Sequence, residues 1–162
     1  MNMRIEWRDA LSVDNNGPID RDHKYLIKLI NELGEFKAQS SRNIKFNDIL
    51  SELKTYTIVH FAREEKLQKA ANYPEHEDHK KEHHDLIHKL DVIISVAKKN
   101  IAENKSKEQA EVIFEQTQKF LKNWLLQHVV QHDLKMKDYV VKMQGEAKSL
   151  PDIEGSNKVE TE

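Results

Sequence analysis

The sequence has no cysteine, which excludes disulfide bonds, thiolate metal ligands and iron–sulfur clusters. Only 4 glycines and 3 prolines occur among 162 residues, so few positions interrupt a helix. No apolar run reaches the roughly 18 residues that a membrane-spanning helix needs. The N-terminal MNMRIEWRDA also lacks the apolar segment of a secretory signal peptide. We therefore expect a cytoplasmic protein that has no membrane partner.

An excess of charge of one sign is missing as well. The chain carries 26 basic and 28 acidic residues, a formal net charge of −2. This balance gives no electrostatic reason to expect a nucleic-acid partner. Hydrophobic residues make up 38% and charged residues 33% of the chain, and its length suits one domain with one core. Histidine is the residue present in excess, with 9 copies clustered along the sequence.

Apolar residues recur at helical spacing in four segments, so the sequence predicts four long helices. Pro74 marks one of the breaks, because proline disfavours a helical conformation in the residue before it. Ser106 and Gln109 form a capping box at the start of the last helix, whose inner stripe includes Phe120 and Leu121. The predicted elements are an arm at 1–19, helices at 19–39, 44–71, 75–100 and 107–143, and loops at 40–43, 72–74 and 103–106.

Four long helices with short connections predict an all-α fold, an antiparallel up-down four-helix bundle with an N-terminal arm. The C-terminal residues are polar, and this composition predicts a flexible tail. We therefore place the domain at residues 1–143 and the tail at residues 144–162.

A turn of about 100° per residue separates the histidines of the third helix into two sets. His79 and His83 lie within about 20° of the apolar stripe through Leu86, so both face the interior. His84 and His88 have the same spacing but lie roughly 120–160° from that stripe, toward solvent. Only one of the two histidine pairs therefore faces the core of the bundle.

The same test selects inward-facing side chains in the other helices. His60 and Glu64 share the apolar face of the second helix, whereas Glu65 faces the other side. His23 lies on the inner face of the first helix, and His128 continues the inner stripe of the fourth. The remaining histidines are assigned to the surface or to loops: His76, His84, His88 and His132.

Five inward histidines and a carboxylate in one small bundle predict a metal centre. A single buried histidine such as His23 is more often a hydrogen-bonded core residue than a ligand. An unpaired buried carboxylate such as Glu64 costs several kcal/mol, however, and mutual hydrogen bonds would leave many ring nitrogens unmatched. A metal satisfies all of these groups. Because the set exceeds the needs of one tetrahedral zinc, two carboxylate-bridged ions fit it better.

The segment QHVVQHD at residues 127–133 leaves the choice of ligand pair open. On an ideal helix His132 lies about 40° from His128, whereas Asp133 lies about 140° away. Regular geometry therefore favours the two histidines. Asp133 can share the face of His128 only if the helix is locally distorted, by a π bulge or a similar unwinding.

Five spaced pieces of sequence together resemble the hemerythrin family, and within it the bacteriohemerythrins. They are Trp7, IDRDHKYL at 19–26, HFAREE at 60–65, HKKEH at 79–83 and WLLQHVVQHD at 124–133, in matching order and spacing. The resemblance covers about residues 5–140. It implies a non-heme di-iron centre inside a four-helix bundle, with reversible uptake of O2.

The resemblance also implies a ligand set. It assigns His79, His83 and His128 to one iron, His23 and His60 to the other, and Glu64 and Asp133 to both as bridges. The cofactors would be two iron ions (Fe2+/Fe3+) joined by an oxo or hydroxo group, with O2 at an open position of the second iron. The residues expected to line the O2 pocket, which are equally explained as ordinary core, are Trp124, Leu125 and Val129.

Two departures from the family pattern stand near this set. Arg21-Asp22 replaces the Glu-Gln that often precedes the first histidine, and we expect both side chains to face outward. Met136 replaces a tyrosine found in many members, which implies the loss of a hydrogen bond near the bridge.

The resemblance favours a protein that stores, delivers or scavenges O2 over an enzyme. The alternatives are an oxygen or redox sensor, which would need an unidentified protein partner, and a slow di-iron oxidase or peroxidase.

Overall fold

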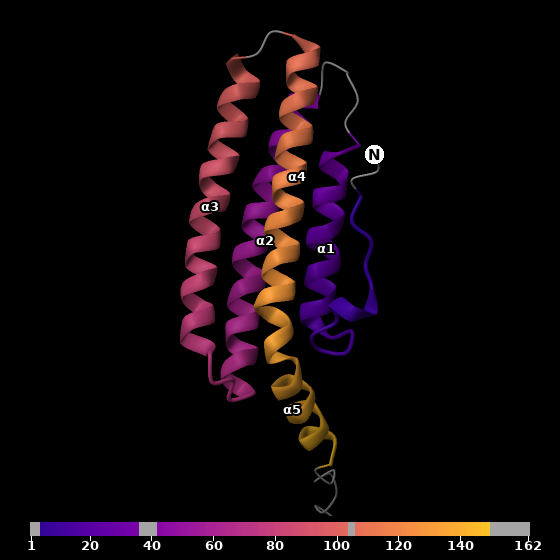
Figure 1. Cartoon of the computed structure of the whole chain (residues 1–162), viewed down its shortest axis with the longest axis vertical. Helices are drawn as coiled ribbons and strands as arrows, with labels where there is room; N and C mark the ends of the chain where they lie inside the picture. The colour runs from indigo at the N-terminus through magenta and orange to yellow at the C-terminus, as the bar shows by residue number, and fades with distance from the viewer. Residues whose placement is uncertain (1–3, 36–41, 104–105, 150–162) are drawn as a thin grey trace, which may run out of the picture.

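The computed structural model of the chain consists of long antiparallel helices packed side by side (Figure 1), and it describes residues 4–35, 42–103 and 106–149. No strand occurs among the described residues, and the predicted all-α, up-down four-helix bundle is confirmed. In chain order the elements are a 3-10 turn (Asp9–Leu11), α1 (Pro18–Leu33), α2 (Arg42–Ala70), α3 (His76–Glu103), α4 (Lys107–Gln131), a 3-10 turn (Asp133–Met136) and α5 (Lys137–Ser149).

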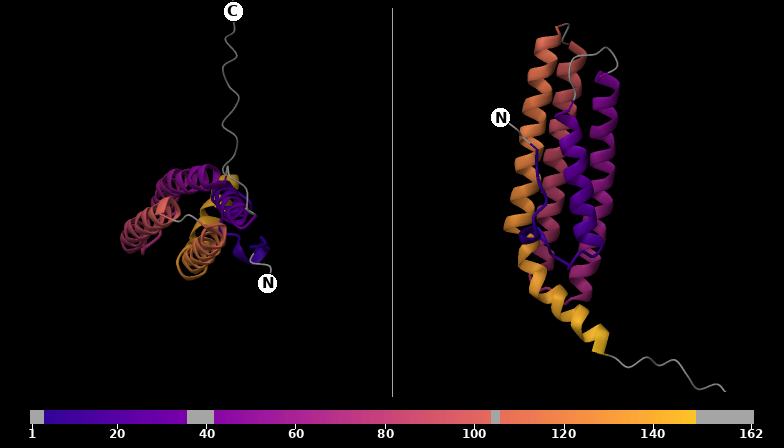
Figure 2. Two further views of the ribbon diagram at one scale, coloured as in Figure 1. Left: turned by 90° about the horizontal axis from the view of Figure 1, so that it is seen from above. Right: turned by 90° about the vertical axis from the view of Figure 1, so that its right-hand side faces the viewer.

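The four long helices form a closed ring around the core. Each packs against the next in the chain, and α1 also packs against α4; Figure 2 shows this arrangement from above. The inner stripes predicted from helical spacing meet at the axis of this ring. One leucine from each helix is fully buried there: Leu26, Leu53, Leu90 and Leu121.

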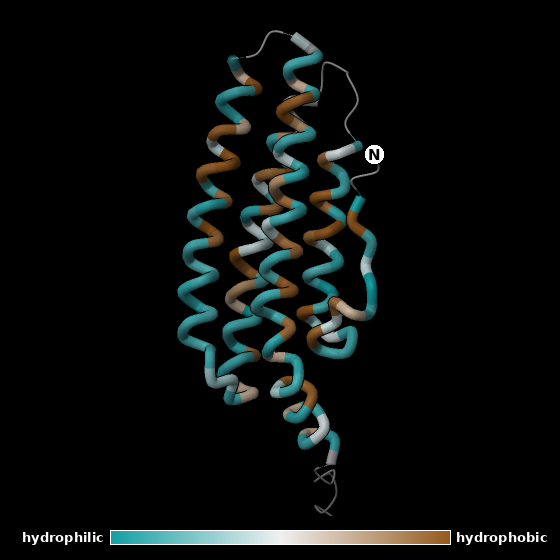
Figure 3. The backbone as a smooth tube through the Cα atoms, in the orientation of Figure 1, coloured by the Kyte–Doolittle hydropathy of each residue, from teal (hydrophilic) through white to brown (hydrophobic). Residues whose placement is uncertain are grey.

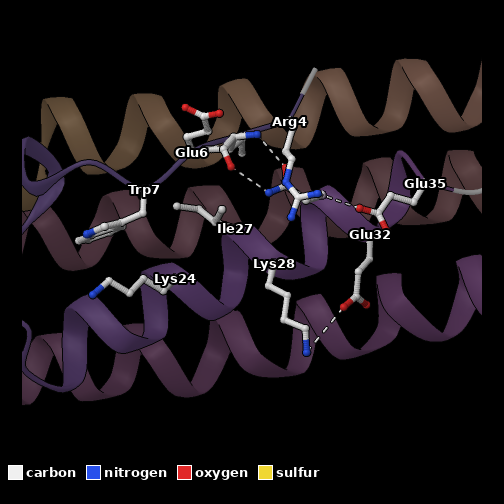
Figure 4. A pocket seen from close by; sticks show the side chains of 10 residues that line it. Arg4, Glu6, Trp7, Lys24, Ile27, Lys28, Glu32 and Glu35 are labelled. Atoms are coloured by element: carbon white, nitrogen blue, oxygen red, sulfur yellow. Dashed lines mark hydrogen bonds and ion pairs between the residues drawn. The ribbon is translucent and has the colours of Figure 1, made fainter. Parts of the chain in front are cut away.

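The N-terminal arm runs along α1 and is fastened to it. The backbone N–H of Ile5 donates to Asn31 Oδ1 at 2.7 Å, and Asn31 Nδ2 donates to the carbonyl of Ile5 at 2.9 Å. Lys24 lies over the ring of Trp7, 4.8 Å from its centroid. Figure 4 shows the polar groove that the arm and α1 form between them.

Two buried aspartates fix the start of α1. Asp14 accepts the backbone N–H groups of Ile19 and Asp20 at 2.8 and 3.0 Å. Asp20 in turn accepts from the Ser12 hydroxyl at 2.6 Å and from the backbone N–H of Val13 at 2.7 Å. Carboxylates at a helix N-terminus satisfy N–H groups that have no partner within the helix. The arm and the first turn of α1 are thereby locked together, about one turn before His23.

Two hydrophobic clusters occupy the interior at different levels. The larger one follows the bundle axis, and the smaller one joins Val13, Ile19, Tyr73, Met136 and Val140 at the end where α4 gives way to α5. The buried polar side chains of His79 and His83 come from the first turns of α3, which Figure 3 colours as hydrophilic. The predicted metal site lies at this polar level.

Several predicted helix boundaries, and the predicted burial of one residue, were wrong. The fourth helix does not run unbroken to residue 143, because α4 ends at Gln131 and α5 follows a 3-10 turn. Phe120, predicted on the inner stripe of that helix, is 42% exposed. α2 begins at Arg42, inside the predicted loop 40–43, and α3 continues to Glu103. α1 ends at Leu33, before the predicted residue 39, and residues 36–41 lie outside the described residues.

The structure also bears on the predicted helix cap at Ser106, the predicted end of the domain and the expected lack of a membrane span. The Ser106 side chain accepts the backbone N–H of Gln109 at 3.2 Å, which confirms the predicted cap. α5 continues past the proposed domain boundary at residue 143 to Ser149, and residues 150–162 of the proposed tail lie outside the described residues. Among the described helices, none combines the length and the apolar character of a membrane span.

Candidate metal centre

The seven predicted ligands meet at one level of the bundle, each at most 4% exposed. They come from all four long helices and from the turn after α4. α1 contributes His23, α2 contributes His60 and Glu64, α3 contributes His79 and His83, α4 contributes His128, and the second 3-10 turn contributes Asp133. This convergence is the result of helix packing, because the seven residues span more than 100 positions of the chain.

Asp133 is surrounded by three imidazoles. Nε2 of His128, His79 and His23 lies 2.9, 3.1 and 3.2 Å from its carboxylate oxygens. Glu64 has the matching position on the other side. Its Oε2 lies 3.1 Å from Nε2 of His83. The other two imidazoles near Glu64 are farther away, with His79 at 3.8 Å and His60 at 3.9 Å.

The two carboxylates connect two groups of possible ligands. One group consists of Glu64, Asp133, His79, His83 and His128, and the other consists of Glu64, Asp133, His23 and His60. Within each group the donor atoms all lie within 4.8 Å of one another. The structure therefore forms two adjacent positions that share both carboxylates, and one position has one imidazole more than the other.

The donor atoms of this cluster lack hydrogen-bond partners. All five Nε2 atoms and all four oxygens of Glu64 and Asp133 are buried, and despite separations as short as 2.9 Å none of them makes a hydrogen bond among the described residues. Leaving so many buried polar atoms unsatisfied is strongly destabilising, because each desolvated group costs about 1–3 kcal/mol. Cations at the two positions would satisfy all of them, so the residues present fit a pair of metal ions.

In the metal-free site the pKa values of the two carboxylates shift in opposite directions. Burial and the charge of Asp133 together raise the pKa of Glu64. Burial also opposes ionisation of Asp133, but His128 and the other imidazoles outweigh it and hold the pKa of Asp133 well below its usual range. Burial lowers the pKa of His60 to about 4. A metal-free site therefore keeps Asp133 ionised, Glu64 protonated and His60 neutral.

The turn between His128 and Asp133 is distorted, which is the condition under which Asp133 can share the face of His128. α4 ends at Gln131, His132 has φ −121° and ψ −59°, and a 3-10 turn begins at Asp133. Asp133 is fully buried as a result, whereas the His132 side chain is 31% exposed and lies 3.8 Å from Glu82. The distortion is a break into a 3-10 turn rather than a π bulge.

Comparison with known proteins identifies the family of the chain. Residues 17–140 match the family described as Hemerythrin HHE cation binding domain, which is well over half of the chain. This chain belongs to the hemerythrin family. A "Bacteriohemerythrin" of Stenotrophomonas maltophilia is 30% identical over 137 residues, which cover 84% of this chain and 81% of that protein.

Further hemerythrins are similar to the chain in sequence or in fold. A "Hemerythrin-like protein" of Naegleria gruberi is 27% identical over 82% of this chain and 91% of its own length. The crystal structure of a hemerythrin mutant aligns with a TM-score of 0.65 at 21% identity, over 86% of this chain and 98% of that chain. This likeness shows that the chain has the hemerythrin fold.

Asp22, expected to face outward, is instead 2% exposed in this hemerythrin bundle. It accepts a hydrogen bond from the Tyr56 hydroxyl at 2.7 Å and pairs with Arg63, and it lies 3.4 Å from Nδ1 of His60. These contacts outweigh its burial and lower the pKa of Asp22 to about 2. The prediction failed because it considered α1 alone, whereas the partners of Asp22 all come from α2.

Sequence reasoning also missed Phe61, the residue after His60. Its ring stacks on His83 with a centroid distance of 3.8 Å and an interplanar angle of 3°, and it contacts His128 at 5.2 Å. Phe61 lies three residues before Glu64, and this helical spacing was the signal that could have placed it at the site. The three expected O2-pocket residues are buried in the same hydrophobic cluster: Trp124, Leu125 and Val129.

Two further residues of this hemerythrin, His76 and Met136, are buried. His76, assigned to a loop or the surface, is only 8% exposed, and its Nδ1 lies 3.1 Å from Gln68 Oε1. Met136 is fully buried in the smaller hydrophobic cluster and has no hydrogen-bond donor in its side chain. The loss of a hydrogen bond near the bridge stays a prediction.

Proposed function

We propose that the chain binds O2 reversibly at a di-iron centre and thereby stores, delivers or scavenges it. The observation that carries this proposal is the pair of adjacent ligand groups, which share both carboxylates but differ by one imidazole. If both positions held metal ions of the same coordination number, the one with fewer imidazoles would have a free position for an exogenous ligand.

In this proposal each side chain has one task. His79, His83 and His128 would hold one iron, and His23 and His60 would hold the other. Glu64 and Asp133 would bridge the pair, since each carboxylate lies near imidazoles of both groups. Imidazole and carboxylate donors together suit iron, and two ferrous ions held in this way would supply the two electrons needed for reversible O2 binding.

Apolar side chains pack against the centre and limit the access of water to it. Phe61 stacks on the ring of His83 and makes a T-shaped contact with that of His128. The near neighbours of His128 in the sequence are each at most 5% exposed: Trp124, Leu125 and Val129. Exclusion of water prevents side reactions of the bound ligand. This surrounding favours a carrier, because reversible binding requires that the ligand leave unchanged.

The experiment for this proposal measures gas uptake by anaerobically prepared ferrous protein. We expect uptake of one O2 for every two irons, followed by release of the same amount under reduced pressure. Release of peroxide with oxidation of the iron would instead support a slow oxidase, and failure to bind iron would overturn the proposal altogether.

A further inference from the structure

A buried carboxylate lies behind the histidine that serves the second metal position. Oδ2 of Asp22 is 3.4 Å from Nδ1 of His60, and Nε2 of the same ring faces the bridging Glu64 at 3.9 Å. Asp22 and His60 are respectively 2% and 0% exposed. The two ring nitrogens of His60 thus face different partners, with the metal position on one side and the carboxylate on the other.

Asp22 is itself held by two further side chains of α2. Its Oδ1 accepts the Tyr56 hydroxyl at 2.7 Å. Its Oδ2, the oxygen nearest His60, also receives the guanidinium of Arg63. The Arg63 side chain is 42% exposed, so its charged group connects this buried oxygen to the protein surface.

A carboxylate behind a metal-binding histidine is a common arrangement in metalloproteins. A histidine that binds a metal through one nitrogen usually donates its other N–H to a carboxylate or carbonyl, which fixes the ring and raises its basicity. A more basic ligand stabilises the higher oxidation state of its iron. A guanidinium on the same carboxylate oxygen works in the opposite direction, because it attracts negative charge away from the imidazole.

We propose that Asp22 is a positioning residue that orients His60 and strengthens it as an iron ligand, and that Arg63 moderates this effect from the surface. The inference rests on the proposed di-iron function, because it assigns His60 to the iron with the open position. The competing explanation is structural, in which Asp22 and Arg63 form only a buried ion pair that joins α1 to α2.

The two explanations differ in the sign of their effects on reduction potential. In iron-loaded protein, Asp22→Asn should shift the midpoint potential to more positive values, slow oxidation in air and weaken iron binding by about 10- to 100-fold. Arg63→Gln should shift the potential to more negative values, because Asp22 is then free to polarise His60 fully. Arg63→Lys retains the positive charge and serves as the matched control, with a potential close to that of the unmodified protein.

A purely structural pair predicts something else. Both Asp22→Asn and Arg63→Gln would then lower the melting temperature, with no shift of potential or with shifts in the same direction, and either result overturns the inference. If the unmodified protein itself binds no iron, the di-iron proposal fails rather than this one.

A second measurement needs no iron. In metal-free protein, ¹⁵N NMR should locate the proton of neutral His60 on Nδ1, facing Asp22. A proton on Nε2 instead would contradict the proposed hydrogen bond, whatever the metal content of the protein. This measurement also covers the case in which Asp22→Asn fails to fold.

Discussion

The Asp133 carboxylate lies 2.9 Å from Nε2 of His128, although five positions separate the two residues in the chain. A regular helix would place them about 140° apart and would bring His132 to the site instead. The break after Gln131 reverses this choice, because it turns Asp133 inward and leaves His132 partly exposed. The local backbone distortion therefore determines which of the two side chains, Asp133 or His132, faces the buried cluster.

This relationship predicts opposite results for two neighbouring substitutions. Asp133→Asn removes a bridging charge, so iron binding should weaken by more than about 100-fold, beyond the range expected for residues that only support a ligand. His132→Ala should leave the iron content at two per chain. Iron analysis after anaerobic loading measures both, and loss of iron in His132→Ala would show that the wrong residue was chosen.

The histidines of α2 and α3 allow a second matched comparison. His60→Ala should lose one iron position, because His60 is one of only two imidazoles in its group. His84→Ala should keep both irons, since the His84 side chain is 88% exposed. Metal titration of the two variants tests this, and equal losses in both would refute the assignment of inner and outer faces.

Iron binding should depend on pH through Glu64. Burial and Asp133 raise the pKa of metal-free Glu64 to about 8, whereas a bridging Glu64 must be ionised. Below that pH each binding event releases this proton. His23 can release a second one, because Asp133 outweighs its burial and raises the pKa of His23. The apparent affinity should therefore fall by about tenfold per pH unit for each proton released as the pH decreases. Calorimetry in buffers of different ionisation enthalpy counts the released protons. Glu64→Gln should bind iron more weakly and release one proton fewer for each binding event.

Phe61 offers a test of the dry surroundings of the site. Phe61→Leu should lower the stability by about 1–2 kcal/mol, because it removes ring contacts with His83 and His128. It should also speed the oxidation of iron, since water gains access. Leu53→Ile, a substitution in the fully buried core at another level, is a suitable control and should leave the oxidation rate unchanged. An oxidation rate unaffected by Phe61→Leu would argue against a water-excluding role.

Helical periodicity predicted the bundle and the inner and outer histidines, because burial within a long regular helix follows from angle alone. His79 and His83 are buried whereas His84 and His88 are exposed, as the spacing indicated. The break after Gln131 did not follow from periodicity, since it depends on the backbone conformation of His132. It was expected only because Asp133 was needed at the site.

Other residues were missed because their burial depends on contacts between helices. Asp22 lies outside the apolar stripe of α1, yet Tyr56 and Arg63 of α2 enclose it. His76 begins α3 and is buried beside Gln68 of α2. Single-helix patterns contain no information about such pairs, which become apparent only when the helices are packed.

The visible spectrum of the iron-loaded protein tests the account most directly. Ferrous protein should be colourless, should develop a visible charge-transfer band on exposure to O2, and should lose that band under vacuum through repeated cycles. His60→Ala should show no such band, and His84→Ala should behave as the unmodified protein does. A band that never forms, or that decays once to ferric protein and does not return, would contradict reversible O2 binding at this site.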